Sequence, residues 1–439
     1  MTMTRLALTG LRHRTGAFVA TFLSAALGAA ILMTFASLID TAGGPGVNAT
    51  SEEGLITTAS VAGGWCLLIV VFAVSSTMSL SVRQRALEMG VLRNTGATGA
   101  QIRRMIAGEA VLVSLAAAVL AVPAGLVLGR VLLGLLQDTG QVARSIGYAF
   151  GPVALGAGFG VTVLGSLLGA LLAARRRARS VPGRGRVIAA AVFLLAGVSC
   201  GVVTATVMKG KGVDAMQTAG QASIWFAIGL ALLSPWLLRL VTAALAGPLR
   251  LVAGAAGELA ALNMRQSARQ MSGAVMPVIL FTGVTTATVI MQSIEDRAAA
   301  GAPLDEVQRS VQTLNYVVVG MIALFVAIML VNTLLAATGH RRREFGQQRL
   351  AGATPGQVVT MVVAESVLLT VTGVVFGSLA SVVTILPFSI ARVDDASPSV
   401  SPVAYAGVVL VAVVLTFGAA VGAAWRAIAG RAIDAATAA

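Results

Sequence analysis

The segment Glu88-Met-Gly-Val-Leu-Arg-Asn-Thr-Gly-Ala-Thr-Gly-Ala-Gln101 recurs without gaps as Glu344-Phe-Gly-Gln-Gln-Arg-Leu-Ala-Gly-Ala-Thr-Pro-Gly-Gln357. The offset of 256 residues still holds at Glu109 and Glu365. Apolar runs long enough to cross a bilayer precede and follow each copy. The chain is therefore a duplicated membrane module that carries the same glycine-containing hinge twice on one face of the membrane.

The composition excludes a soluble domain, because 57% of the residues are hydrophobic, 11% are charged and the mean hydropathy is +0.90. About 20 apolar residues span the hydrocarbon as a helix, which satisfies its own backbone there. Continuous apolar runs, rather than short alternating ones, exclude a β-barrel. We predict an all-α membrane protein with ten spans in a 4+2+4 arrangement: 17–39, 57–82, 110–135, 150–174, 187–207, 222–246, 272–293, 314–339, 363–388 and 402–425.

Three of these spans contain residues that interrupt an apolar helix. In 110–135, 222–246 and 363–388, we expect tilt, a kink or an earlier end. The interrupting residues are Pro123, Arg130, Pro235, Arg239 and Pro387.

The basic residues indicate the orientation. With the N-terminus inside, 24 of the 31 Lys and Arg fall on the cytoplasmic side, as the positive-inside rule requires. We therefore expect a multi-pass protein of the cell membrane with both termini in the cytoplasm. The net charge of +14 follows from this topology and from attraction to anionic inner-leaflet lipids, so nucleic acid is not an expected partner.

The predicted spans group into two similar modules. An even number of spans separates corresponding elements, so the repeats are parallel. Leu6–Arg12 and Leu259–Arg265 precede the modules and are either short amphipathic helices or simple flanking segments. The expected division is a cytoplasmic segment 1–16, a first module 17–174, a basic linker 175–186, two additional spans 187–246, a linker 247–271, a second module 272–425 and a cytoplasmic tail 426–439.

Both hinge copies predict a helix leaving the membrane, a sharp turn and a returning helix. Thr98 and Thr354 stand where helix N-caps belong, and Pro355 takes the first helical position of the second copy. Gly96 and Gly352 stand where the preceding helices stop. Arg85/Glu88 and Arg341/Glu344 are spaced i,i+3, so these charges either pair within their helix or bind a partner.

Glu109 and Glu365 form a second repeated pair. Each lies at the start of a long apolar run, where an isolated carboxylate is costly. The expected partners are Arg93 and Arg349 of the hinges or an interfacial amide. A structural clamp on the returning helix is favoured over a proton relay, because the site lies at the interface rather than at mid-bilayer.

The pattern Glu-x-Gly-x-x-Arg-x-x-Gly-Ala-Thr, with Gln and the later Glu behind it, resembles the signature of FtsX-like permease domains of MacB-type (type VII) ABC transporters. The resemblance covers both four-span modules. It implies that 83–99 and 341–355 contact cytoplasmic ATPase subunits, with two copies for one complete permease. The residues so implicated are Arg83, Arg85, Glu88, Arg93, Gly96, Ala97, Thr98, Arg341, Glu344, Gly346, Arg349, Gly352, Ala353 and Thr354, with Glu109 and Glu365 as structural interfacial acids.

The chain has no G-x-x-x-x-G-K-[S/T] motif, so the ATPase is expected to be a separate subunit. No His, Cys or carboxylate cluster has metal or triad spacing, so no catalytic residue, metal or cofactor is expected. Many relatives insert a large extracytoplasmic domain, but the gaps 40–56 and 294–313 are too short for one. Substrate choice then depends on span surfaces, which favours hydrophobic or amphipathic cargo.

Export of such cargo is the leading hypothesis. The alternative is a mechanotransmitting module that controls a sensor kinase or a cell-wall hydrolase. An ion-coupled secondary transporter would require ionisable groups near mid-bilayer, where mainly Ser, Thr and Asn332 occur. The span interfaces are expected to use small residues: Gly63, Gly64, Gly125, Gly129, Gly156, Gly158, Gly160, Gly373 and Gly377.

Overall fold

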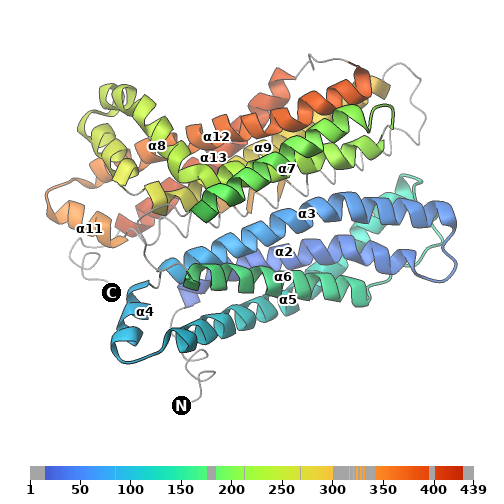
Figure 1. The fold of residues 1–439 in the computed structure, drawn as a ribbon, viewed down its shortest axis with the longest axis horizontal. Helices are drawn as coiled ribbons and strands as arrows, with labels where there is room; N and C mark the ends of the chain where they lie inside the picture. The colour runs from blue at the N-terminus through green and yellow to red at the C-terminus, as the bar shows by residue number, and fades with distance from the viewer. Residues whose placement is uncertain are drawn as a thin grey trace. The chain divides into compact units, whose positions relative to one another are not determined.

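The computed structural model describes residues 15–84, 86–175, 184–211, 213–266, 268–299, 342–394 and 401–428, with scattered positions between 316 and 331. Within these ranges the backbone forms α-helices joined by short turns, with no strand (Figure 1). Nine helices of the described part are long and apolar enough to cross a membrane. The chain is therefore an all-α, multi-pass membrane protein. The expected span 314–339 lies largely outside the described residues, so the count of ten and the 4+2+4 arrangement stay predictions.

Contacts divide the chain into two compact units, of which unit 1 comprises Met1–Ser180 and Ala299–Phe325. Its helices are α2 (Thr15–Ala42), α3 (Ala49–Gln84), α4 (Ala86–Asn94), α5 (Gly99–Asp138) and α6 (Pro152–Arg175). Helix α2 packs against α3, α5 and α6, and α6 also packs against α3 and α5 (Figure 1). The short α4 contacts α3 and α5 at the end of this four-helix bundle where α3 passes into α5.

Unit 2 comprises Val181–Ala298 and Val326–Ala439. Its helices are α7 (Arg184–Thr206), α8 (Val213–Gln266), α9 (Ala268–Ala299), α11 (Arg342–Leu350), α12 (Pro355–Val393) and α13 (Pro402–Ile428). Helix α12 packs against α7, α8 and α13, and the short α11 contacts α12 and α13. Helix α9 is buried over most of its length.

The prolines do not end their helices. Helix α5 continues through Pro123, α8 through Pro235 and α12 through Pro387, so the earlier end considered for these spans does not occur. A proline removes one backbone donor, whereas ending a helix within hydrocarbon would leave several polar groups without partners. Continuing the helix is therefore the less costly choice.

The segment 247–271, expected to be a linker, is mostly helical. Helix α8 extends to Gln266, and its regular path is interrupted at Gly254, where φ is 54° and ψ is −133°. After the break, Ala260, Ala261 and Met264 are buried, while Leu259 is exposed. This part of α8 thus packs one face against the rest of unit 2, and of the two alternatives for Leu259–Arg265 the helix is present. The equivalent Leu6–Arg12 lies outside the described residues.

Glycines allow close helix packing at some of the predicted positions. A Cβ added at Gly377 of α12 would lie 2.7 Å from Cβ of Thr282 on α9, and one at Gly125 of α5 would lie 2.8 Å from Cβ of Met33 on α2. Added Cβ atoms at Gly63, Gly129, Gly158 and Gly373 would also lie closer to neighbouring side chains than ordinary packing allows. At Gly64, Gly156 and Gly160, no atom of the described residues lies within 4 Å of an added Cβ, so close packing is not seen there.

Candidate functional site

The two hinge copies fold as two elbows. We define the first elbow as residues 86–101 and the second elbow as residues 342–357. Each begins with a nine-residue helix, α4 or α11, and continues through a four-residue turn into a long helix, α5 or α12. The geometry of the two turns can be compared atom by atom.

In the first elbow, α4 ends at a glycine in the left-handed region. Gly96 has φ of 95°, and its N–H donates to the carbonyl of Arg93 at 3.1 Å. The N–H of Ala97 donates to the carbonyl of Leu92 at 2.9 Å. This pair of hydrogen bonds is a Schellman motif, which satisfies carbonyls that the end of the helix leaves free.

The second elbow repeats the same motif at the end of α11. Gly352 has φ of 101°, and its N–H donates to the carbonyl of Arg349 at 3.1 Å. The N–H of Ala353 donates to the carbonyl of Gln348 at 3.0 Å. The corresponding donor–acceptor distances in the two elbows therefore differ by no more than 0.1 Å.

The helices that return from the elbows begin with identical caps. Thr98 has φ and ψ of −72° and 153°, and Thr354 has −73° and 153°. The hydroxyl of each threonine accepts from the N–H three residues later, at 3.3 Å in both copies. The side chains of Gln101 and Gln357 in turn accept from the threonine N–H groups, at 2.8 and 2.9 Å. Sequence reasoning identified the threonines but missed the glutamines, although the spacing T-x-x-Q indicates such a capping box.

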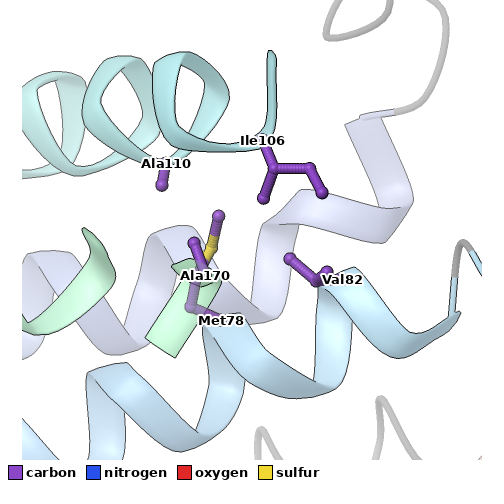
Figure 2. Packing of buried hydrophobic residues seen from close by; sticks show 5 residues of the cluster. All are labelled: Met78, Val82, Ile106, Ala110 and Ala170. Carbon is purple, nitrogen blue, oxygen red and sulfur yellow. The ribbon is translucent and has the colours of Figure 1, made fainter. Parts of the chain in front are cut away.

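An apolar side chain anchors each elbow to its unit. Met89 of the first elbow, and Ile102 just after it, pack against a buried cluster that joins the ends of α3, α5 and α6. Figure 2 shows the buried residues of this cluster. In the second elbow, Phe345 occupies the position equivalent to Met89 and is fully buried. The buried cluster of the first elbow consists of Met78, Val82, Ile106, Ala110 and Ala170. Both elbow helices are therefore fixed to the helices behind them.

The surface of the first elbow is basic. Arg93 is exposed, as are Arg103 and Arg104 in the first turns of α5. A Cβ added at Gly99 would lie 3.8 Å from Nη1 of Arg103 and 4.0 Å from Nη2 of Arg93, so both guanidinium groups lie beside the turn. The turn itself exposes Gly96 and Thr98, and Ala97 is half-buried.

The second elbow has the same backbone but a different surface. Arg349 is half-buried, and its Nη1 donates to the carbonyl of Ile428 at 3.0 Å, which connects α11 to the end of α13. Gly352 and Thr354 are exposed, whereas Ala353 is half-buried. Gly346 is buried, so it packs inside unit 2.

Some predicted residues fall outside the described part of the chain. Arg85 and Arg341 are among them, and the side chains of Arg83 and Glu88 are not described. The expected i,i+3 ion pairs within the hinge helices therefore remain predictions.

The repeated acids are buried behind the elbows. Glu109 is 3% exposed and Glu365 is 2% exposed. Oε1 of Glu365 accepts from Nδ2 of Asn263 at 2.5 Å, and the same amide lies 3.4 Å from Oε1 of Glu344. The amide thus connects α8, α11 and α12. The role of the two acids as a structural clamp stays a prediction. Sequence reasoning missed Asn263, for which the 256-residue offset gives Ala7 in the first copy.

Two elbows with matching turn geometry, each joined to long apolar helices, define a duplicated membrane module. A family model for the FtsX-like permease C-terminal region matches residues 60–182 and 316–430, which together exceed half of the chain. The two matched segments begin 256 residues apart, which is the offset of the internal repeat. The chain belongs to the FtsX-like permease family and is a membrane permease component of an ABC-type transporter. Among curated proteins, no match to this chain is found.

Proposed function

We propose that this chain is the subunit through which a separate cytoplasmic ATPase drives export of a hydrophobic or amphipathic substrate. The observation that carries the proposal is the repetition of the elbow geometry in two segments 256 residues apart. One ATPase subunit would bind each elbow, so two ATPase copies serve one chain. The permease family generally works with an ATPase partner, and the sequence contains no phosphate-binding loop of its own.

The structure of the elbows supports transmission of force. Only residues 95–98 separate α4 from α5, and both ends of this turn are fixed by hydrogen bonds. Because the turn is short and hydrogen-bonded at both ends, a displacement of α4 is expected to displace α5 as well. Helix α5 has 40 residues and is about 60 Å long, so it extends well beyond the roughly 30 Å of hydrocarbon. ATP binding changes the permease only if the two permease states bind the ATPase pair with different affinities.

The two elbows would use different contacts with the ATPase. The first presents three exposed arginines near its turn, which favours an acidic surface on the ATPase. In the second, the arginine equivalent to Arg93 instead binds the carbonyl of Ile428. We therefore assign Arg93 to partner binding and Arg349 to stabilisation of the elbow.

The substrate assignment rests on the small outer connections. Residues 43–48 are all that separates α2 from α3, and residues 139–151 join α5 to α6. These segments cannot form a domain that encloses a soluble ligand. The surfaces available to cargo are then those of the membrane-spanning helices, which face lipid.

The test uses the full chain in lipid nanodiscs together with its candidate ATPase. Thr95 and Ala351 occupy equivalent exposed positions in the two turns, so a tryptophan there blocks docking without disturbing the core. We expect Thr95→Trp combined with Ala351→Trp to weaken ATPase binding and permease-stimulated ATP turnover by about tenfold or more, equivalent to about 1.4 kcal/mol. Arg144→Trp, an exposed change in the 139–151 loop, is the matched control and should have no effect. Wild-type binding and turnover in the double variant would refute the proposal.

A second comparison separates partner binding from stability. Arg93→Glu should weaken ATPase binding and leave the thermal midpoint of the isolated chain unchanged. Arg349→Glu should lower the thermal midpoint, because it removes the donor to Ile428. The assignment of roles is wrong if the two variants behave alike in both measurements.

A further inference from the structure

An apolar groove lies between α5 and α6 of unit 1. Its volume is about 680 Å³, which is in the range of small-molecule sites. Val119 is 59% exposed, so the groove opens to the surface of the chain. Within the described part of the chain, no atom lies within 4 Å of a Cβ added at Gly156, so the absence of a side chain there keeps the groove open. The lining residues are Val119, Val122, Pro123, Leu155, Gly156 and Phe159.

A single arginine stands above this groove on the same face of α5. Arg130 follows Pro123 by seven residues, which is close to two helical turns and about 10 Å along the axis. The Arg130 side chain is exposed, and within the described ranges no carboxylate oxygen lies within 4 Å of its guanidinium. An arginine beside hydrocarbon without a carboxylate partner is energetically unfavourable. A phosphate group is a strong alternative partner, because it accepts hydrogen bonds from several N–H groups of the planar guanidinium.

Helix length indicates the level of Arg130 in the bilayer. The buried Glu109 and Arg130 are 21 residues apart on α5, which corresponds to about 31 Å of helix. This distance matches the roughly 30 Å thickness of the hydrocarbon. Arg130 therefore lies at the headgroup level of the leaflet away from the elbows, and the groove lies about 10 Å deeper in that leaflet.

We infer that this groove binds one anionic phospholipid, whose phosphate contacts Arg130 and whose acyl chain occupies the space between α5 and α6. The apolar lining excludes the headgroup from the groove, and the arginine favours a negative headgroup above it. This inference concerns binding of a membrane lipid and does not depend on the proposed export function.

The guanidinium of Arg130 lies against an aromatic ring of the 139–151 loop. Its Cζ lies 5.7 Å from the centroid of the Tyr148 ring, a cation–π geometry. The Tyr148 hydroxyl occupies the space that a Cβ at Gly129 would need. Burial raises the pKa of Tyr148, so the phenol stays neutral and leaves the charge of Arg130 available.

The experiment uses the full chain in detergent with two phospholipids that carry the same photoreactive acyl chain, one with a glycerol headgroup and one with a choline headgroup. One basic residue near the membrane surface contributes an amount equivalent to about a fivefold preference for anionic lipid. We expect crosslinks at residues 119–123 and 155–159, with about fivefold more from phosphatidylglycerol than from phosphatidylcholine. No ATPase is present, so the outcome is independent of the proposed transport.

Variants test the headgroup contact and the groove separately. Arg130→Gln should abolish the preference for phosphatidylglycerol, and Arg130→Lys should retain most of it. Gly156→Leu should reduce crosslinking of both lipids, because the new side chain fills the groove while meeting no atom at its Cβ. Arg144→Gln, which changes an arginine that already pairs with Asp138, is the control. Crosslinks that map elsewhere, or a preference that survives Arg130→Gln, would overturn the inference.

Discussion

At the scale of single residues, Gly96 and Gly352 carry the geometry of the elbows. Their φ angles of 95° and 101° lie in a region that side chains with a Cβ rarely adopt. Both N–H groups are also part of the Schellman hydrogen bonds. Any other residue at these positions must either adopt a strained backbone or open the turn.

Gly96→Ala and Gly352→Ala should each destabilise the chain by about 1–2 kcal/mol, because the Cβ of alanine makes the left-handed backbone conformation sterically unfavourable. Gly90→Ala is the matched control, since Gly90 lies within α4 and no described atom lies within 4 Å of an added Cβ. The same substitution there should stabilise the helix by about 0.5–1 kcal/mol. Thermal midpoints in nanodiscs measure the three variants, and a fall for Gly90→Ala equal to that for Gly96→Ala would contradict this account.

Asn263 contributes to the buried acid site through a single amide. Asn263→Ala removes the donor to Glu365 and should cost about 1–3 kcal/mol, because a buried acceptor loses a partner. Combining it with Glu365→Ala should cost less than the two single changes together, since the variants remove one shared interaction. Asn94→Ala, at an exposed position of α4, is the control. Strict additivity of the thermal shifts would argue against a direct contribution from this hydrogen bond.

At the scale of elements, charged groups connect the helix ends opposite the elbows. In unit 1 the carboxylate of Asp40, near the end of α2, accepts from the N–H groups of Gly151, Val153 and Ala154 at 2.8–3.1 Å. These groups form the N-terminus of α6, where a negative charge is favourable. In unit 2, Glu295 of α9 and Arg392 of α12 form two parallel hydrogen bonds of 2.7 and 2.8 Å. Each unit is thus fixed at both ends of its helices.

Arg392→Gln should therefore destabilise unit 2 by about 1–3 kcal/mol, because the ion pair is bidentate and its side chains are only 30% and 17% exposed. Arg144→Gln breaks the Arg144–Asp138 pair, whose side chains are 80% and 72% exposed. Exposed pairs contribute little, so this control should change stability by less than about 1 kcal/mol. Hydrogen exchange at the ends of α9 and α12 would locate the effect, and equal thermal shifts in the two variants would show that burial does not matter here.

The sequence predicted the elements of the elbows well because their signals are local. A glycine after a helix and a threonine before one specify a turn within a few residues, so Gly96 and Thr98 were identifiable without a structure. The long spans were also predictable, since the apolar runs satisfy the length requirement of the bilayer.

The missed features depend on contacts distant in sequence. Asn263 lies 102 residues from Glu365, and Arg349 lies 79 residues from Ile428. No local pattern specifies either pair. Within 247–271 only Leu259–Arg265 was considered as a helix. The rest was missed for a related reason, because burial of Ala260 and Met264 against the rest of unit 2 stabilises a segment whose composition resembles a linker.

At the scale of the whole molecule, the duplication preserved backbone geometry and let side chains diverge. The two turns contain equivalent hydrogen bonds of nearly equal length. In contrast, Arg103 and Arg104 of the first copy correspond to Val359 and Thr360 of the second. Replacing a glycine or proline that a turn requires lowers the free energy of unfolding, whereas replacing a charged residue at the surface changes it little. Under the proposed function, divergence at the surface would permit the two elbows to bind the same ATPase differently.

The orientation of the whole chain is the last prediction. The excess of Lys and Arg on one side predicts that both elbows lie in the cytoplasm and the 139–151 loop outside. Single cysteines can test this in a variant that lacks Cys66 and Cys200. Thr95→Cys and Ala351→Cys should react with a membrane-impermeant thiol reagent only after the cells are opened. Arg144→Cys and Lys211→Cys, which are equally exposed, should react in intact cells. An ATPase in the cytoplasm can reach the elbows only under this arrangement, so labelling of Thr95→Cys from outside would exclude both the topology and the coupling mechanism built on it.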